Sequence, residues 1–378
     1  MNNKICILSS VHPAFDTRIF YKQTKTLVKA GYDVTLIAQH DKDETVDGVK
    51  IIALYKPKNR LQRMLGLTPK VLSLSLKQNA EVYHFHDPEL IPVGTILKTL
   101  GKKVIYDVHE DYNKQILSKS YLPKITRNSI ALITKAIENT ASKFFDGIIT
   151  ATDNIQKNFS SHNKAISVRN FPILSPSFSV KKFSDNDIFN LIYVGILFEI
   201  KGITQIIKAL ELVDSNKPLK LTMCGEFIQP EYMEKVRSLK GFEKVEHLGW
   251  VDSHAIPDLL RKADAGIVCF LPEPNYIKSM PIKLFEYMEA SLPIIASNFP
   301  LWKKIVEGNK CGVCVDPLKP KNIAEAIEYL MEQPVLRKKM GKNGRQAVLE
   351  KYNWEKEAIK LLAVYENLIV EKTKRINE

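Results

Sequence analysis

The stretch of sequence that decides the fold is FNLIYVGILFEIKG, residues 189–202. It begins with a mostly apolar run, Phe189–Val194, which is typical of a buried strand and ends at Gly195. Polar residues, Glu199 and Lys201, then lead to a second glycine. A buried strand that opens into a short polar turn is typical of a parallel α/β sheet whose two faces are covered by helices.

The same alternation of apolar runs and helical patterns extends along the whole chain. In the N-terminal half the expected strands are KICILSS, DVTLIA, EVYHFH, KKVIYDVH and GIITAT. In the C-terminal half they are FNLIYVG, LKLTMCG, KVEHLGW, AGIVCF, LPIIAS and CGVCV. We therefore predict an α/β protein of two doubly wound, Rossmann-like domains that face each other across a cleft. The predicted parts are residues 1–172, a Ser- and Pro-rich linker at 173–187, residues 188–352, and a C-terminal helix at 353–378 that packs back on the first domain.

Composition points to an intracellular globular protein. The 378 residues carry a net charge of +13, and residues 1–180 contain 25 Lys and Arg against 15 Asp and Glu, so most of the excess lies in the first half. No stretch is long enough to span a bilayer, and MNNKICILSS reads as a first strand rather than as a signal peptide. The five Cys suit a reducing compartment. We interpret the pair Cys311 and Cys314 as structural, because it lies in a strand pattern rather than at a helix start.

Ligands bind at the carboxyl ends of strands in open parallel sheets, so polar residues that follow strands are the candidate site residues. In the first half these are Asp16, Arg18, His86, Asp87, His109 and Glu110. The sequence contains no GxGxxG after the first strand, no P-loop and no GxSxG, which argues against dehydrogenases, nucleoside triphosphatases and serine hydrolases. His84 and His86 share one face of a strand and Asp87 points away, so we predict no metal site there.

The segment KSMPIKLFEYMEA, residues 278–290, reads as a helix that begins near Pro281. Lys283 and Glu286 are spaced i, i+3, so both side chains stand on one face near the helix N-terminus. A weak surface ion pair and a ligand site both explain this spacing.

The sequence resembles the family 4 nucleotide-sugar glycosyltransferases, which have the GT-B fold. The segments that carry the resemblance are HPAFDTRIFYKQ, YHFHDPEL, VIYDVHEDY, YVGILFEIKG, SMPIKLFEYMEASLPIIAS and KYNWEKE, and they span nearly the whole chain in the family's order. They are similar to the bacterial branch that builds capsule, O-antigen and exopolysaccharide units.

The resemblance implies a role for each candidate residue. Glu286 corresponds to the Glu that binds the ribose hydroxyls of the donor, Lys201 to a phosphate-binding Lys, and Gly195 to the glycine where the backbone approaches the donor. Lys283 would add positive charge or hold Glu286 in place. His109 corresponds to a His beside the donor sugar and the leaving phosphate. Acceptor-side roles are implied for Asp16, Arg18, His86, Asp87 and Glu110, although a salt bridge between Asp16 and Arg18 that only fixes the loop explains that pair equally well.

Two positions depart from the family pattern. Lys278 stands at a donor-sugar position where many members have Glu, and Ile196 stands where many have the Arg of a VGR motif. The contacts that the family makes at these two positions therefore do not carry over, and donor preference can differ.

The resemblance implies a retaining, metal-independent glycosyltransferase without a cofactor. Its donor would be a UDP-, GDP- or dTDP-sugar, and its acceptor would be a growing glycan linked to polyprenyl diphosphate. The alternatives are a nucleotide-sugar 2-epimerase and a catalytically idle GT-B module that binds glycan or a partner protein.

Two segments of the first half contain basic and apolar residues but no acidic residue. Residues 56–78 carry six Lys and Arg, and residues 112–136 carry five. This pattern suits a helix that lies in the interface of an anionic membrane, and nothing accompanies it that reads nucleic acid. We therefore expect a cytoplasmic protein attached peripherally to the inner face of the cytoplasmic membrane.

Overall fold

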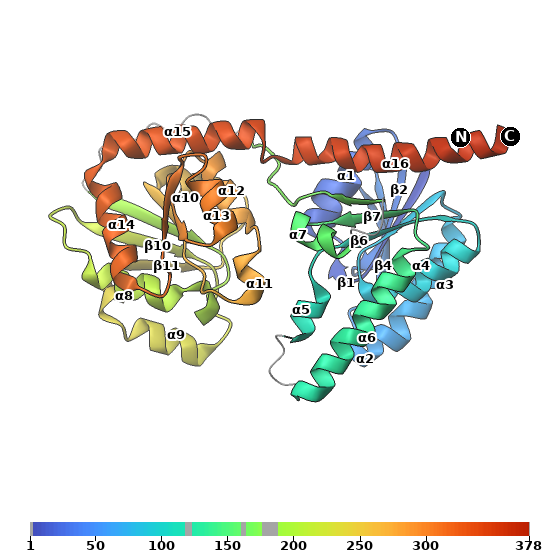
Figure 1. The fold of residues 1–378 in the computed structure, drawn as a ribbon, viewed down its shortest axis with the longest axis horizontal. Coiled ribbons are helices and arrows are strands. Elements are labelled where there is room, and N and C mark those ends of the chain that lie inside the picture. Colours follow the sequence, from blue (N-terminus) through green and yellow to red (C-terminus); the bar gives the residue numbers. More distant parts are fainter. Residues whose placement is uncertain (1–2, 118–122, 160–163, 176–187, 378) are drawn as a thin grey trace. The chain divides into compact units, whose positions relative to one another are not determined.

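A computed structural model describes residues 3–117, 123–159, 164–175 and 188–377, and it contains two compact units (Figure 1). The first unit consists of Met1–Asn170 with Trp354–Glu378, and the second of Phe171–Asn353. The predicted fold class is confirmed, because both units are α/β with a parallel sheet and a long helix follows the last strand.

In the first unit, the described strands form a sheet in the order β3-β4-β2-β1-β5-β6-β7-β8. All neighbouring pairs are parallel except β3 and β4. The strands are β1 (Lys4–Pro13), β2 (Asp33–Gln39), β3 (Glu44–Val46), β4 (Val49–Leu54), β5 (Val82–Phe85), β6 (Lys103–Val108), β7 (Gly147–Thr150) and β8 (Ala165–Ser167). The helices are η1 (Thr17–Thr24), α1 (Lys25–Lys29), α2 (Arg60–Gln62), η2 (Arg63–Leu67), α3 (Thr68–Gln78), η3 (Pro88–Leu90), α4 (Ile91–Thr99), α5 (Tyr112–Leu117), α6 (Lys124–Ser142), α7 (Asp153–Gln156), η4 (Lys157–Phe159) and α16 (Trp354–Asn377).

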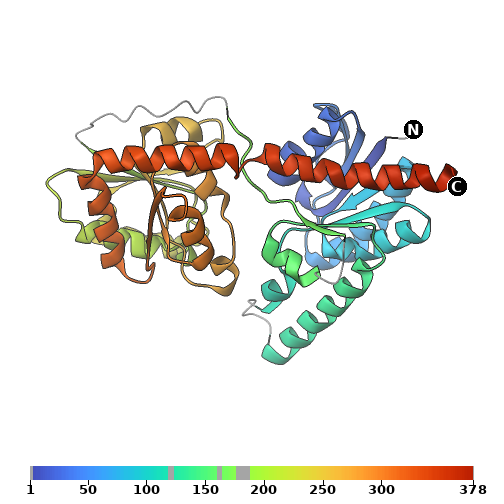
Figure 2. The same ribbon diagram turned by 45° about the horizontal axis from the view of Figure 1, so that its top comes forward.

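Side chains alternate between the two faces of this sheet and build two separate cores. On β1, Cys6 and Leu8 belong to the core under α3 and α4, whereas Ile5 and Ile7 belong to the core on the opposite face. The second core includes residues of α16, among them Tyr365, so the C-terminal helix packs on the same unit as the N-terminal strands (Figure 2).

One connection of the first unit differs from the predicted alternation of strands and helices. No helix separates β2 from β4; instead β3 and β4 form a hairpin through Asp47 and Gly48, whose φ values are 52° and 79°. Asp-Gly is the favoured pair for a two-residue turn with both residues at positive φ.

In the second unit, the described strands form a fully parallel sheet in the order β11-β10-β9-β12-β13-β14. They are β9 (Phe189–Val194), β10 (Leu219–Cys224), β11 (Val245–Gly249), β12 (Ala265–Val268), β13 (Ile294–Ser297) and β14 (Gly312–Val315). The helices are η5 (Glu199–Lys201), α8 (Ile203–Leu212), α9 (Pro230–Arg237), η6 (Lys240–Lys244), α10 (Ile256–Lys262), α11 (Pro274–Ile277), α12 (Ile282–Glu289), α13 (Pro300–Val306), α14 (Pro320–Glu332) and α15 (Pro334–Glu350).

Helix α12, which carries Lys283 and Glu286, is held against the middle of this sheet. The Tyr287 hydroxyl accepts a hydrogen bond from the backbone N–H of Val194 at 3.0 Å, which ties the helix to β9. A Cβ on Gly266 of β12 would lie 2.2 Å from the Tyr287 ring, so only glycine allows this close approach. These two contacts fix where α12 presents its polar face.

Candidate functional site

In the second unit, the predicted donor residues gather where the strand order reverses. The order turns back between β9 and β12, and the carboxyl ends of such strands open a crevice in α/β sheets. Gly195 follows β9 with φ of 130°, a conformation that favours glycine. A Cβ on Gly195 would lie 2.5 Å from the Nζ of Lys283, so the absence of a side chain makes room for this ammonium group.

Two ammonium groups, those of Lys201 and Lys283, lie against one aromatic ring. Their Nζ atoms are 4.0 Å and 5.3 Å from the centre of the Phe270 ring. Lys201 also lies 4.0 Å from the Tyr276 ring, and Lys283 donates a hydrogen bond to the Tyr193 hydroxyl at 3.3 Å. The Lys283 ammonium also lies 4.4 Å from the centre of the Tyr193 ring. Cation–π contacts hold the two cations but leave N–H groups for a ligand.

This environment makes both lysines easier to deprotonate. Burial lowers the pKa of Lys201 to about 8. Burial and the charge of Lys201 lower the pKa of Lys283 to about 7, although Glu286 opposes the shift. A bound anion would restore both positive charges, so the ligand that this site favours carries negative charge.

Glu286 lies one turn after Lys283 on α12 and is partly buried. Its influence on the pKa of Lys283 places the carboxylate near that ammonium group. The structure thus brings Gly195, Lys201, Lys283 and Glu286 together. Lys278 lies at the end of α11 and is exposed.

In the first unit, a buried polar cluster is centred on Asp107 of β6. This residue was not among the candidate site residues predicted from the sequence. Arg18 donates from Nη2 to both carboxylate oxygens at 3.0 and 3.1 Å, and Gln23 donates to Oδ2 at 2.6 Å. Burial raises the pKa of Asp107, but the charge of Arg18 and the neighbouring histidines outweigh burial and hold the pKa well below its usual range. The signal in the sequence was a carboxylate inside the apolar run VIYDV, because a buried strand rarely carries an unpaired charge.

Three histidines surround this carboxylate. The distances from its oxygens are 3.5 Å to His84 Nε2, 3.7 Å to His86 Nδ1 and 3.6 Å to His109 Nε2. His86 Nδ1 and His109 Nε2 share a hydrogen bond of 2.8 Å. Burial lowers the pKa of His84, and burial with the neighbouring His84 and His109 lowers that of His86 further, so these two rings are neutral near pH 7. His109 is 12% exposed and forms the edge of the cluster.

The salt bridge between Asp16 and Arg18 that the sequence allowed is not formed. Asp16 caps η1 instead: its Oδ1 accepts from the backbone N–H groups of Arg18 and Ile19 at 2.8 and 2.9 Å. Its Oδ2 lies 3.4 Å from His12 Nδ1. Burial raises the pKa of Asp16, but His12 and the backbone donors outweigh it and lower the pKa to about 2. The Arg18 side chain pairs with Asp107 instead.

Asp87 braces the carboxyl-terminal half of β1. Its Oδ2 accepts hydrogen bonds from the Ser9 hydroxyl at 2.9 Å and from the backbone N–H groups of Ser10 and Val11 at 2.7 and 3.2 Å. Glu110, in contrast, is exposed.

The cluster around Asp107 does not favour a metal ion. His84, His86 and Asp107 have potential ligand atoms within 4.8 Å of one another. However, both oxygens of Asp107 already accept from the guanidinium of Arg18, which would repel a cation at this site.

The cysteine pair of the second unit has no reactive character. Cys311 and Cys314 are free, and burial raises the pKa of each thiol to about 12. Reactive cysteines have lowered pKa values, so a structural role fits both.

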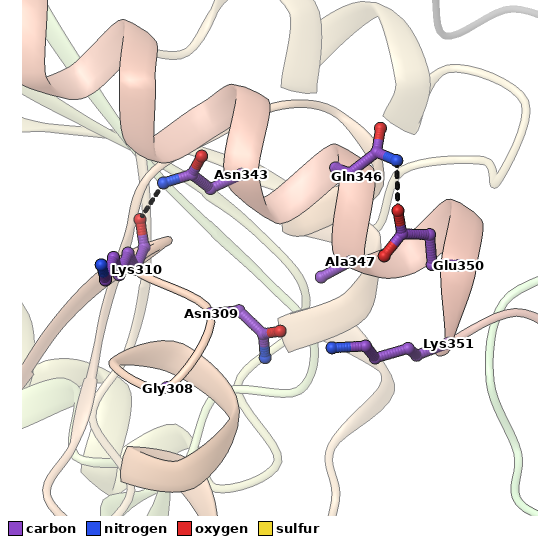
Figure 3. A pocket seen from close by; sticks show the side chains of 8 residues that line it. All are labelled: Gly308, Asn309, Lys310, Asn343, Gln346, Ala347, Glu350 and Lys351. Atoms are coloured by element: carbon purple, nitrogen blue, oxygen red, sulfur yellow. Dashed lines mark hydrogen bonds between the residues drawn. The ribbon is translucent and has the colours of Figure 1, made fainter.

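A shallow polar pocket elsewhere in the second unit contains none of the predicted residues (Figure 3). Asn343 donates to the carbonyl oxygen of Lys310 at 2.9 Å, and Gln346 donates to Glu350.

Comparison with known proteins shows which family the chain resembles. A family model for glycosyl transferases group 1 matches residues 176–347, and a model for glycosyltransferase family 4 matches residues 17–168. An uncharacterized glycosyltransferase, MJ1607, of Methanocaldococcus jannaschii is 26% identical over 176 residues. The alpha-D-kanosaminyltransferase of Streptomyces kanamyceticus is 23% identical over 180 residues. These matches cover 46% and 47% of this chain and less than half of the relatives, 44% and 45%.

Solved structures share the fold over nearly the full length. The sucrose-phosphate synthase of Thermosynechococcus elongatus superposes with a TM-score of 0.73 at 18% identity, covering 97% of this chain and 99% of that chain. Anabaena Alr3699/HepE, solved with UDP and glucose, has a TM-score of 0.71 at 15% identity, with 96% and 99% covered. WaaG, a glycosyltransferase involved in lipopolysaccharide biosynthesis, has a TM-score of 0.69 at 17% identity, with 95% and 99% covered.

The two Rossmann-like units and the likeness to these glycosyltransferase structures show the GT-B fold. Within that class, the two family matches place the chain among the family 4-like glycosyltransferases.

Proposed function

We propose that this protein transfers a sugar from a nucleoside diphosphate sugar to a growing bacterial glycan with retention of anomeric configuration. The observation that carries the proposal is the pair of ammonium groups, Lys201 and Lys283, on the Phe270 ring, with Lys283 beside the side-chain-free backbone of Gly195. Two adjoining cations that pack on aromatic rings suit two adjoining phosphates. The UDP complexes of the similar Anabaena protein support a nucleotide as the ligand.

The nucleoside would be held from α12. A carboxylate offers two acceptor oxygens in one plane, so Glu286 suits the two adjacent hydroxyls of a ribose. The phosphates would then face Lys201 and Lys283, because the Lys283 ammonium group lies near the Glu286 carboxylate and near Lys201. UDP, GDP and dTDP are the donor nucleotides to test.

The two lysines would also assist the chemical step. As the bond between the anomeric carbon and the β-phosphate oxygen breaks, negative charge grows on the departing diphosphate, and fixed cations stabilise it. The acceptor hydroxyl forms the new bond on the same face of the sugar and passes its proton to the departing phosphate oxygen. Because the lysines supply positive charge, we propose transfer without a metal or other cofactor. His109 would contribute a polar contact to the sugar or phosphate.

We propose a lipid-linked glycan, such as a capsule or O-antigen unit, as the acceptor, and peripheral attachment to the inner face of the cytoplasmic membrane. Among the described helices, none combines the length and the apolar character needed to cross a membrane. The first unit instead exposes apolar side chains among basic ones on two of its helical segments. These are Leu61 and Leu65 at α2 and η2, 68% and 70% exposed, and Leu132 of α6, 70% exposed.

The basic residues beside these apolar side chains are available to a surface. Lys56, Lys58 and Arg60 are exposed. Arg63 is partly committed elsewhere, since its Nε donates to Glu89 at 2.7 Å. Part of the second basic segment, residues 118–122, lies outside the described residues.

A ligand screen tests the donor assignment. We expect one of UDP, GDP and dTDP to raise the melting temperature, because a ligand that binds only the folded state stabilises it. The sugar nucleotide of that base should then be consumed only when a glycan acceptor is added. An isomerised sugar formed from donor alone would instead identify an epimerase, and the absence of any nucleotide-induced shift would contradict the proposal.

A further inference from the structure

The histidine cluster of the first unit is built as an ordered chain that leads from the core to the surface. The rings of His84 and His86 have centroids 4.6 Å apart, and those of His86 and His109 4.9 Å apart. His12 follows with its centroid 5.3 Å from that of His109. The exposed fraction of the side chains rises from 0% at His84 and His86 to 12% at His109 and 28% at His12.

The inner end of this chain has a fixed pattern of protons. Burial raises the pKa of Tyr365 well above its usual value, so its hydroxyl keeps its proton and donates to His84 Nδ1 at 2.6 Å. The neutral His84 ring then carries its own proton on Nε2, which faces the ionised Asp107 at 3.5 Å. The carboxylate attracts N–H groups rather than lone pairs, so a proton on His84 Nε2 is favoured.

Burial decides which ring carries the proton between His86 and His109. One ring must donate across the 2.8 Å contact of His86 Nδ1 and His109 Nε2. If His109 donated, the proton of the neutral His86 would sit on its Nε2, which is buried and has no hydrogen-bond partner. A buried N–H without an acceptor is rarer and costlier than an unused acceptor, so His86 is the donor.

His109 is then left with its proton on the other nitrogen. Its Nε2 accepts from His86, and within the described residues its Nδ1 makes no hydrogen bond. The His109 side chain is partly exposed and lies at the outer edge of the buried cluster.

We propose that His86 is a positioning residue: anchored at the buried carboxylate of Asp107, it donates its Nδ1–H to His109 and so presents the Nδ1–H of His109 outward as a hydrogen-bond donor. A fixed N–H donor would stabilise an oxygen that gains negative charge during sugar transfer. The catalytic consequence rests on the proposed function, whereas the arrangement of protons does not.

The arrangement can be measured directly by ¹⁵N NMR of the full chain labelled at histidine, with the His109 signals identified by their loss in His109→Gln. We expect the wild-type protein to hold neutral His109 in the Nδ1–H form. His86→Leu should lose this preference, because it removes the donor. His86→Asn should keep it, because its amide N–H can take the place of Nδ1–H. A wild-type His109 in the Nε2–H form, or an unchanged Nδ1–H form in a folded His86→Leu protein, would overturn the proposal.

Kinetics then test the consequence for transfer. In His86→Leu we expect kcat to fall about tenfold or more, with KM for the donor changed by less than about twofold, and His86→Asn should recover most of kcat. A KM change with kcat intact would overturn the role in transfer. If the protons are arranged as expected but no donor is turned over at all, the proposed function fails and the positioning of His109 stands by itself.

Discussion

Lys283 and Glu286 show how much of a site depends on what surrounds two side chains. Their spacing on α12 was compatible with a surface ion pair or with a ligand site. The structure places the Lys283 ammonium under Tyr193 and Phe270 and beside a second ammonium, Lys201. A surface pair contributes little and needs no such enclosure, so the enclosure favours the ligand site.

If Glu286 binds the ribose, its removal should weaken the binding of nucleotides that carry both hydroxyls. Glu286→Gln keeps the size of the side chain and removes its charge, so we expect a loss of about 1.5–3 kcal/mol, or roughly 10- to 150-fold in Kd. Isothermal titration with the ribonucleoside diphosphate and its 2′-deoxy analogue measures it. The wild-type protein should prefer the ribonucleotide, and the variant should lose most of that preference. Equal affinities for the two in the wild-type protein would remove Glu286 from the ribose site.

The lowered pKa values of the two lysines predict that diphosphate binding takes up protons. In the free protein Lys283 loses its proton as pH rises through about 7 and Lys201 through about 8, whereas both are charged when an anion is bound. Affinity should therefore fall as pH rises from 7 to 9, and on the order of one proton should be taken up per diphosphate at pH 8. Titration in two buffers of different ionisation enthalpy measures the uptake.

Two substitutions sharpen this test. Lys283→Met should lower both the affinity and the proton uptake, whereas Lys208→Met, which alters an exposed lysine on α8, should change neither. The corresponding nucleoside without phosphates should bind without proton uptake. Diphosphate binding that is independent of pH between 7 and 9 would show that the lysines keep their charges without a ligand.

The regular elements were predictable because each carries its signal locally. Apolar runs predicted the long parallel strands of both sheets, and polar residues after them predicted where the sites lie. The hairpin of β3 and β4 was missed, although Asp47 and Gly48 are a strong turn signal, because a helix was expected between all strands.

Contacts between distant elements were less accessible from the sequence. Arg18 and Asp107 come from η1 and β6, and nothing local shows that they meet. Tyr365 reaches His84 across 281 positions of the chain. Asp16 caps η1 with one oxygen and lies beside His12 with the other, whereas Arg18 pairs with Asp107. These contacts depend on how distant elements pack in the folded chain, and local sequence patterns do not reveal them.

Gly266 of β12 allows α12 to pack closely on the sheet, so a larger residue at this position should affect nucleotide binding. A Cβ at position 266 would lie 2.2 Å from the Tyr287 ring, so Gly266→Ala must displace the helix that carries Lys283 and Glu286. We expect a loss of about 1–3 kcal/mol in unfolding free energy from overpacking, together with weaker nucleotide binding. Urea denaturation and nucleotide titration measure the two effects. Full affinity in a destabilised Gly266→Ala protein would mean that the site tolerates movement of α12.

The charge of the whole molecule is distributed in a way that suits different partners for its two units. Most of the net positive charge belongs to residues 1–180, where exposed basic and apolar residues lie together on α2, η2 and α6. Helix α4 contacts both α3 and α6, so the two segments belong to one helical layer of the first unit. The second unit holds its two site lysines in an aromatic enclosure instead of displaying them.

This distribution predicts salt-sensitive binding of the protein to anionic membranes through the first unit. Each Lys or Arg near such a surface adds about 1 kcal/mol, and exposed leucines can enter the interface. In sedimentation assays, the protein should pellet with phosphatidylglycerol vesicles at low salt, be released as salt rises, and ignore phosphatidylcholine vesicles. Replacing Lys56, Lys58 and Arg60 with Gln should abolish pelleting and leave nucleotide binding intact. The matched change of three exposed lysines on α15 in the second unit, Lys338, Lys339 and Lys342, should leave pelleting unchanged. If both triple variants bind vesicles equally, net charge rather than this surface attracts the protein, and an acceptor in free solution becomes the better proposal.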